Sequence, residues 1–260
     1  MPTDADGASA FFPRRVPAGR LGVAVVAELV ELIVTGQLKE GDLLPPEGTL
    51  SEHFGVSRTV LRESVKRLEE KGLVIVSQGR GTQVQAPGYW NMLDPIVLSA
   101  LIDNDESLGV LDELTVVRAS LEAAMAREVA SSRNAEELRR LQNALTAMRE
   151  SENETDSFRQ ADVVFHYALM EISGNRLAEN IAKHLNKRAV ESSRYQGINP
   201  PDAVALTLQE HAAIVDAIAR HDSDAAEKAM LDHIQVSWER RRLRDTPKRS
   251  RSGAAGQSKP

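Results

Sequence analysis

The sequence predicts a mainly α-helical protein, with an N-terminal winged helix-turn-helix that has a small β wing and a C-terminal all-helical bundle. Residues 44–84 give the first indication, since they read as two short helices and a hairpin with glycines at the turns. From Pro95 onward, every periodic segment has helical spacing. Aromatic residues make up only 4% of the chain and there is no cysteine, which excludes disulfides and thiol chemistry.

The first helix is expected at residues 21–34, where Val25, Leu29 and Ile33 recur four apart and give one apolar face. In the helix-turn-helix that follows, Gly55 supplies the positive φ of a tight turn. Ser57 stands at the N-cap of the second helix, where its hydroxyl can accept a backbone N–H.

The second helix of this module carries basic side chains near its start. Arg58 and Arg62 are one turn apart, where a recognition helix enters the major groove, and arginine reads guanine through two parallel hydrogen bonds. Gly72 ends the helix, and Arg80 lies on a glycine-flanked loop that can reach a phosphate or the minor groove. Alternatively, these basic side chains form an ordinary solvated helix face. That interpretation does not explain why the turn before the helix, the glycine at its end and the glycine-rich loop all occur at the spacing of a winged helix-turn-helix.

The charge distribution agrees with a DNA-binding module at the N-terminus. The net charge is −6, yet residues 57–80 hold six Lys or Arg against three Asp or Glu. Only the surface that meets the phosphates must be basic. No apolar run approaches the roughly 18 residues of a membrane span, and the first residues lack the order of a signal peptide, so a cytoplasmic location is expected.

The domain organisation follows from these patterns. The helices of the C-terminal half are expected at 95–103, 107–130, 133–151, 155–173, 176–195, 203–220 and 223–242. The predicted parts are a disordered tail at 1–18, the winged helix-turn-helix at 19–86, a linker with a linker helix at 87–104, the helical domain at 105–243 and a disordered basic tail at 244–260.

A second group of residues has the composition of a metal site. Asp162 and His166 are four apart on one helix face, and His211 and His233 lie on two later helices among apolar residues. A helical bundle builds a core metal site from residues on facing helices in this manner. Imidazole and carboxylate ligands suit zinc, nickel, manganese or iron. Alternatively, these histidines are ordinary core residues, whereas His184 and His221 are expected on the surface.

The N-terminal module resembles the GntR family of transcription regulators. The resemblance covers residues 21–84 and is carried by GQLKEGDLLPPE, LSEHFGVSR, LRESVKRLEEKGLV and GRGTQV. It implies DNA contacts at Ser57, Arg58, Arg62 and Gly79, and the chain departs from the family pattern at Gly48, where Arg is usual. The full set of expected DNA-binding residues is Ser57, Arg58, Val60, Arg62, Gln78, Gly79 and Arg80.

The helical region from 111 to 238 resembles the FCD ligand-binding domain of the FadR subfamily. This resemblance implies that the Asp and the three His hold a divalent transition metal, zinc before nickel, manganese or iron, and that the effector is a small carboxylate such as an organic or sugar acid. Arg118 is the expected carboxylate clamp; the alternative is a surface pair with Glu122, four residues on. Asn175 is expected to bind the effector or to cap the next helix.

The function expected from both regions is that of a metabolite-responsive transcription regulator, a repressor rather than an enzyme. A homodimer is expected because symmetric operators are read by two copies of a recognition helix. Two alternatives stay open from the residues: a metal-dependent hydrolase or isomerase, and a metal-free dimerisation module on a DNA-binding domain. No HExxH motif supports the former.

Overall fold

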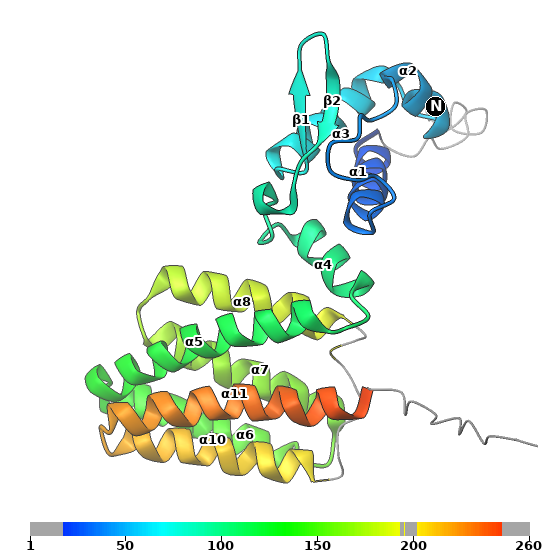
Figure 1. The fold of residues 1–260 in the computed structure, drawn as a ribbon. Helices are drawn as coiled ribbons and strands as arrows, with labels where there is room; N and C mark the ends of the chain where they lie inside the picture. The colour runs from blue at the N-terminus through cyan, green and yellow to red at the C-terminus, as the bar shows by residue number, and fades with distance from the viewer. Residues whose placement is uncertain (1–17, 193–194, 196–201, 246–260) are drawn as a thin grey trace, which may run out of the picture. The chain divides into compact units, whose positions relative to one another are not determined.

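The computed structural model of the protein describes residues 18–192, 195 and 202–245. The chain divides into two compact units, residues 1–104 and residues 105–260 (Figure 1). The tails expected at 1–18 and 244–260 lie outside the described residues except at their inner ends. In the described part of the chain, no helix is long and apolar enough to cross a membrane.

The N-terminal unit is a winged helix-turn-helix, as predicted. Its two strands pair antiparallel, with Val74 opposite Val84 and Ser77 opposite Gly81. The apolar face of the first helix, including Val25 and Leu29, is fully buried in a core that extends to the other elements. The elements are α1 (Ala18–Val34), α2 (Glu47–His53), α3 (Arg58–Glu70), β1 (Val74–Ser77), β2 (Gly81–Val84), the 3-10 helix η1 (Pro87–Tyr89) and α4 (Pro95–Asn104).

Local backbone signals fix the geometry around α3. Gly55 adopts φ +61° in the turn before it, and the Ser57 hydroxyl accepts the backbone N–H of Val60. Gly72 follows the helix at φ +73°, and a Cβ there would lie 2.0 Å from the carbonyl oxygen of Tyr89. Glycine is therefore required at position 72 both for its φ and for the close approach of the backbone.

The C-terminal unit is all-helical in its described residues. α5 packs against α11, α8 and α10, and α6 packs against α7. Asn134 and Glu137 form a reciprocal capping box at the start of α6, where each side chain accepts the other residue's backbone N–H. The helices are α5 (Gly109–Ser132), α6 (Ala135–Glu150), α7 (Thr155–Ile172), α8 (Arg176–Glu191), α10 (Ala203–Ala219) and α11 (Ser223–Asp245).

Candidate metal centre and candidate DNA interface

The C-terminal unit brings Asp162, His166, His211 and His233 into one group. α7 supplies the first two, α10 the third and α11 the fourth, and one ligand atom from each lies within 4.8 Å of the others. The three histidines are buried and Asp162 is partly exposed. Residues that are far apart in the sequence therefore present four potential ligands to one point.

Each of the three imidazoles has its Nδ1 atom occupied by a hydrogen-bond acceptor. A carboxylate or carbonyl oxygen in that place puts the ring proton on Nδ1 and leaves the Nε2 lone pair directed into the group. His166 donates to Glu122 Oε2 at 2.6 Å, His211 to the carbonyl oxygen of Thr207 at 2.8 Å, and His233 to Glu210 Oε2 at 2.8 Å.

With the ring protons on Nδ1, the atoms that face one another inside the group are all hydrogen-bond acceptors. Nε2 of His166 lies 3.3 Å from Nε2 of His233, and Nε2 of His211 lies 3.3 Å from Oδ1 of Asp162. Both atoms of the second pair are buried and have no hydrogen-bond partner. Buried acceptors without a donor destabilise a fold unless a cation or proton lies between them. The three imidazole nitrogens and the carboxylate oxygen are thus ligand atoms that fit a divalent transition metal.

The electrostatics differ between the ligands of the group. Burial, followed by the neighbouring His233, lowers the pKa of His211 to about 3, so its ring stays neutral at physiological pH. Burial would also lower the pKa of His166, but the Glu122 carboxylate outweighs burial and raises that pKa. Burial raises the pKa of Glu122, but Arg118 and His166 together bring it to about 2.

Arg118 is buried, so the surface position considered in the sequence analysis is wrong. Its Nε and Nη2 atoms both lie 2.9 Å from Oε1 of Glu122, whose other oxygen accepts from His166. The side chain also lines a cavity. Arg118 therefore pairs with Glu122 and borders the cavity at the same time.

This cavity opens directly onto the metal group. Asp162, His166 and His233 are part of its wall. A second cavity borders the same Asp162 and shares Arg159, Ser237 and Arg241 with the first. Asp162 is thus the one ligand of the group that both cavities expose.

The other predicted residues of the helical domain lie elsewhere. Asn175 is exposed and caps α8, because its Oδ1 accepts the backbone N–H of Ala178 at 3.1 Å, and it does not line either cavity. His184 and His221 are exposed, as expected.

Sequence reasoning missed the residues that hold the histidines. Glu210 accepts from His233 and is itself bound by Arg240 through two nitrogens, at 2.5 and 3.0 Å. Thr207 precedes His211 by four residues, a spacing that could have indicated the contact of its carbonyl with the ring. The contact between Glu210 and His233 joins two helices, and no local spacing indicates it.

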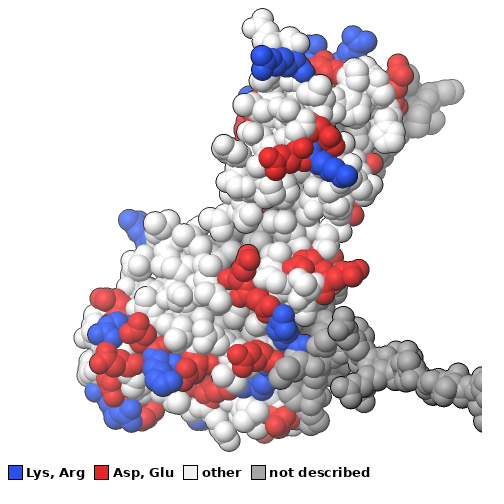
Figure 2. All heavy atoms as spheres, in the orientation of Figure 1, with Lys and Arg blue, Asp and Glu red and all other residues white. Residues whose placement is uncertain are grey.

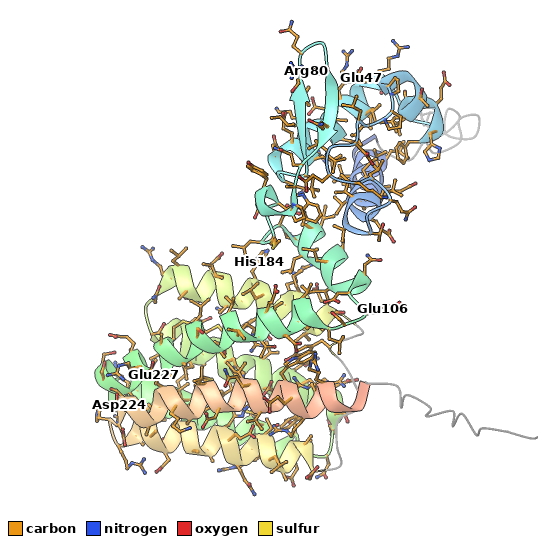
Figure 3. The ribbon with its side chains drawn as sticks, viewed as in Figure 1. Glu47, Arg80, Glu106, His184, Asp224 and Glu227 are labelled. Carbon is orange, nitrogen blue, oxygen red and sulfur yellow. The ribbon has the colours of Figure 1, made fainter. Side chains whose placement is uncertain are left out.

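In the N-terminal unit, the predicted DNA-binding residues are exposed with one exception. Val60 is half-buried and packs against the core of the unit. Figure 2 shows Lys and Arg side chains at the end of the unit that carries the β1–β2 hairpin, and Figure 3 shows Arg80 at the tip of that hairpin. Gly79 adopts φ +77° beside it. The exposed residues are Ser57, Arg58, Arg62, Gln78, Gly79 and Arg80.

Arg62 is held by an acidic neighbour from the preceding helix. Its Nε donates to Oε2 of Glu47 at 2.8 Å, with 67% and 48% of the two side chains exposed. Gly48 follows Glu47 in α2, and a Cβ there would meet only the end of the Arg58 side chain, at 3.9 Å. The structure thus has space for a side chain at the position where the family pattern has Arg.

Two family profiles match the chain. The profile "Bacterial regulatory proteins, gntR family" matches residues 21–84, and the profile "FCD domain" matches residues 113–236. The galactonate operon transcriptional repressor of Escherichia coli K12 is 33% identical over 220 residues, which is 83% of this chain and 94% of that protein. The chain belongs to the GntR family.

Other relatives of this GntR-family protein are also named as transcription regulators. LutR of Bacillus subtilis is 31% identical over 207 residues, covering 78% of this chain and 93% of that one, and the repressor NanR of Escherichia coli K12 DH10B is 31% identical over 225 residues, covering 84% of each. The family consists of DNA-binding regulators, which confirms that the chain is a transcription regulator and not an enzyme.

A solved structure supports the fold independently. The structure of Lar, described as controlling the expression of the Listeria monocytogenes agr system, aligns with a TM-score of 0.52 at 18% identity and covers 88% of this chain and 99% of that one. This likeness concerns the fold only.

Proposed function

We propose that this GntR-family regulator is a cytoplasmic, homodimeric repressor whose operator affinity is set by a small carboxylate bound at a divalent metal in the helical unit. Zinc is the metal we favour over nickel, manganese or iron. The single observation that carries the proposal is the group of three Nε2 atoms and one carboxylate oxygen, of which His211 Nε2 and Asp162 Oδ1 are buried and have no hydrogen-bond partner. A cation is the partner that such a set of acceptors lacks.

The metal would be held by Asp162, His166, His211 and His233. When bound, it would supply a fixed positive charge with open coordination positions, which attract a carboxylate oxygen. The residues around it have a positioning role: Glu122, Glu210 and the Thr207 carbonyl keep each Nδ1 protonated and each Nε2 free. Arg118 borders the cavity beside the group and is oriented by Glu122.

In the N-terminal unit, we propose that the first turns of α3 and the tip of the β1–β2 hairpin contact the DNA. Arg58 and Arg62 would read bases in the major groove, and Arg80 would contact the backbone or the minor groove. Ser57, Val60, Gln78 and Gly79 complete the set we propose. Repression and a sugar-acid effector are proposed because a relative with 33% identity is named as the repressor of a galactonate operon.

The regulatory step needs the effector to favour one state of the protein. A coupling free energy of about 1–3 kcal/mol between the effector site and DNA is the usual scale and changes operator affinity by roughly 5–150-fold.

Elemental analysis of the purified protein tests the metal part of the proposal. The comparison is between the wild type, an Asp162→Ala/His233→Ala variant and a His184→Ala control, whose histidine is exposed and outside the group. We expect one transition metal per chain in the wild type and the control, and none in the double variant. Metal-free wild type that cannot be loaded with zinc would overturn the metal site and favour a metal-free dimerisation module.

Fluorescence anisotropy with labelled operator DNA tests the regulatory part. Zinc-loaded wild type should lose affinity for the DNA when galactonate is added, and the Asp162→Ala/His233→Ala variant should not respond. If the variant responds to galactonate like the wild type, the effector does not bind at the metal group and this part of the proposal is wrong.

A further inference from the structure

The arginines around the two cavities fall into two classes. In the described part of the chain, four arginines line these cavities: Arg118, Arg159, Arg240 and Arg241. Arg118 and Arg240 are each neutralised by a carboxylate, Glu122 and Glu210 respectively, through two nitrogens. These two arginines act on the histidine-holding carboxylates and contribute little free positive charge.

The other two arginines have no such partner. The carboxylate nearest to Arg159 is that of Asp156, at 3.9 Å, and the Asp156 side chain is 94% exposed. Arg241 donates to the Tyr195 hydroxyl at 2.7 Å and stacks over the Tyr195 ring, but no carboxylate of a described residue pairs with it. Both line the first and the second cavity. Arg159 therefore has only the exposed Asp156 carboxylate as an ion-pair partner, and Arg241 acts on the Asp162 carboxyl, whose pKa it helps to lower, without a direct ion pair to it.

The spacing along the helices puts these two charges on one side of the group. On α7, Arg159, Asp162 and His166 occupy positions i, i+3 and i+7, which share a helix face. On α11, His233, Ser237 and Arg241 recur four apart on one face. With a rise of 1.5 Å per residue, each arginine backbone lies roughly 10–12 Å along its helix from the histidine. The two cations are thus offset from His166 and His233, while Arg159 lies one helical turn from Asp162.

From this arrangement we infer that the effector is a small dianion, with a carboxylate at the metal and a second anionic group, carboxylate or phosphate, held by Arg159 and Arg241. The inference rests on the proposed function and specifies the class of effector. A monocarboxylate would fill the metal end only and leave Arg159 and Arg241 without an anionic group of the effector, while Arg118 and Arg240 are already paired through two nitrogens each. Guanidinium groups bind carboxylate and phosphate oxygens through paired hydrogen bonds.

Calorimetric titration of the zinc-loaded full-length protein with matched acids tests this inference. The probes are galactarate against galactonate, 6-phosphogluconate against gluconate, and succinate against butyrate; within each pair the carbon chain is the same and only the second anionic group differs. We expect the dianion of at least one pair to bind tighter by about tenfold or more, as one charge-assisted hydrogen bond would give. The sugar-diacid and phosphate pairs distinguish a second carboxylate from a phosphate.

An Arg159→Gln/Arg241→Gln variant ties the preference to these side chains. It should bind zinc like the wild type, lose the preference for the dianion and keep its affinity for the monoacid. An Arg139→Gln control changes an exposed arginine of α6 that is paired with Glu136 and borders neither cavity. It should behave like the wild type.

The outcomes separate the two proposals. If the monoacids bind the zinc-loaded wild type as tightly as the dianions, or if the double variant keeps the preference, the inference fails and the proposed carboxylate effector stands. If none of the six acids binds to zinc-loaded protein, both the carboxylate effector and its dianionic form are wrong.

Discussion

The two units of the molecule place similar arginine–glutamate pairs in opposite environments. In the N-terminal unit, Arg62 and Glu47 are about half exposed, while in the C-terminal unit Arg118 and Glu122 are almost completely buried, although the N–O distances are nearly the same. An exposed pair contributes about 0–1 kcal/mol, whereas breaking a buried pair destabilises a fold by about 3–5 kcal/mol. Substitutions of the proposed DNA-contacting residues should therefore change the stability of the fold little. Substitutions of the buried residues beside the proposed effector site should change it strongly.

The largest expected effect comes from removing the buried carboxylate. A Glu122→Ala variant leaves Arg118 charged and unpaired in the interior and removes the acceptor of the His166 ring. We expect a loss of about 3–5 kcal/mol in the free energy of unfolding of the C-terminal unit, measured by urea titration with far-ultraviolet circular dichroism, which reports the helices. The matched Glu47→Ala change in the exposed pair should cost less than about 1 kcal/mol. Equal losses in the two variants would contradict the comparison.

Metal removal should affect only one of the two units. If a divalent ion binds the Asp162 group in the folded state alone, an ion concentration about 100 times its dissociation constant stabilises that unit by about 2.7 kcal/mol. Differential scanning calorimetry with and without a chelator should show a lower melting temperature for the C-terminal unit and no change for the N-terminal one. A scan that does not change on chelation, from protein shown to carry metal, would contradict the prediction.

An exposed contact should change binding without changing stability. We expect Arg62→Ala to weaken operator binding by about 1–3 kcal/mol, or roughly 5–150-fold, while the free energy of unfolding stays within about 0.5 kcal/mol. Arg67→Ala removes the same charge near the C-terminal end of α3 and serves as the control. If Arg67→Ala weakens operator binding as much as Arg62→Ala does, then only the net charge of α3 matters and the base contact is wrong.

The smallest effect is expected at an exposed ion pair of the C-terminal unit. It tests whether such a pair contributes as little stability as the exposed pair of the N-terminal unit. Lys183, followed by Arg140, lowers the pKa of Glu171, which is 41% exposed. A lowered folded-state pKa stabilises the fold fully above the ordinary value of 4.5, and this contribution is lost as the pH falls through the folded-state pKa. Glu171→Gln should therefore cost less than about 1 kcal/mol at pH 7, and the difference from wild type should shrink at lower pH or higher salt.

Most of the fold could be predicted from local patterns. The helix ends of the C-terminal unit lie within a few residues of their expected positions because capping residues such as Asn134 and apolar periodicity act within one or two turns. The turn at Gly55 and the helix end at Gly72 were likewise visible, since only glycine readily takes their positive φ.

The candidate site could be predicted only in part. Residues four apart on one helix, such as Asp162 and His166, share a face by geometry, so their pairing follows from the sequence. Burial of Arg118 does not follow, because it depends on how α5 packs against other helices. The contact of Glu210 with His233 is of the same kind, since it joins α10 to α11 and is set by tertiary packing.

The position of the ligand group in the chain has a mechanical consequence. His166 and His233 are 67 residues apart in sequence yet touch at 3.3 Å, and the chain has no cysteine with which to form a disulfide. An ion bound by both residues would close a long loop of the polypeptide, as a disulfide does, and would reduce the entropy of the unfolded state. Unlike a disulfide, such a cross-link would open and close with the supply of metal rather than with the redox state.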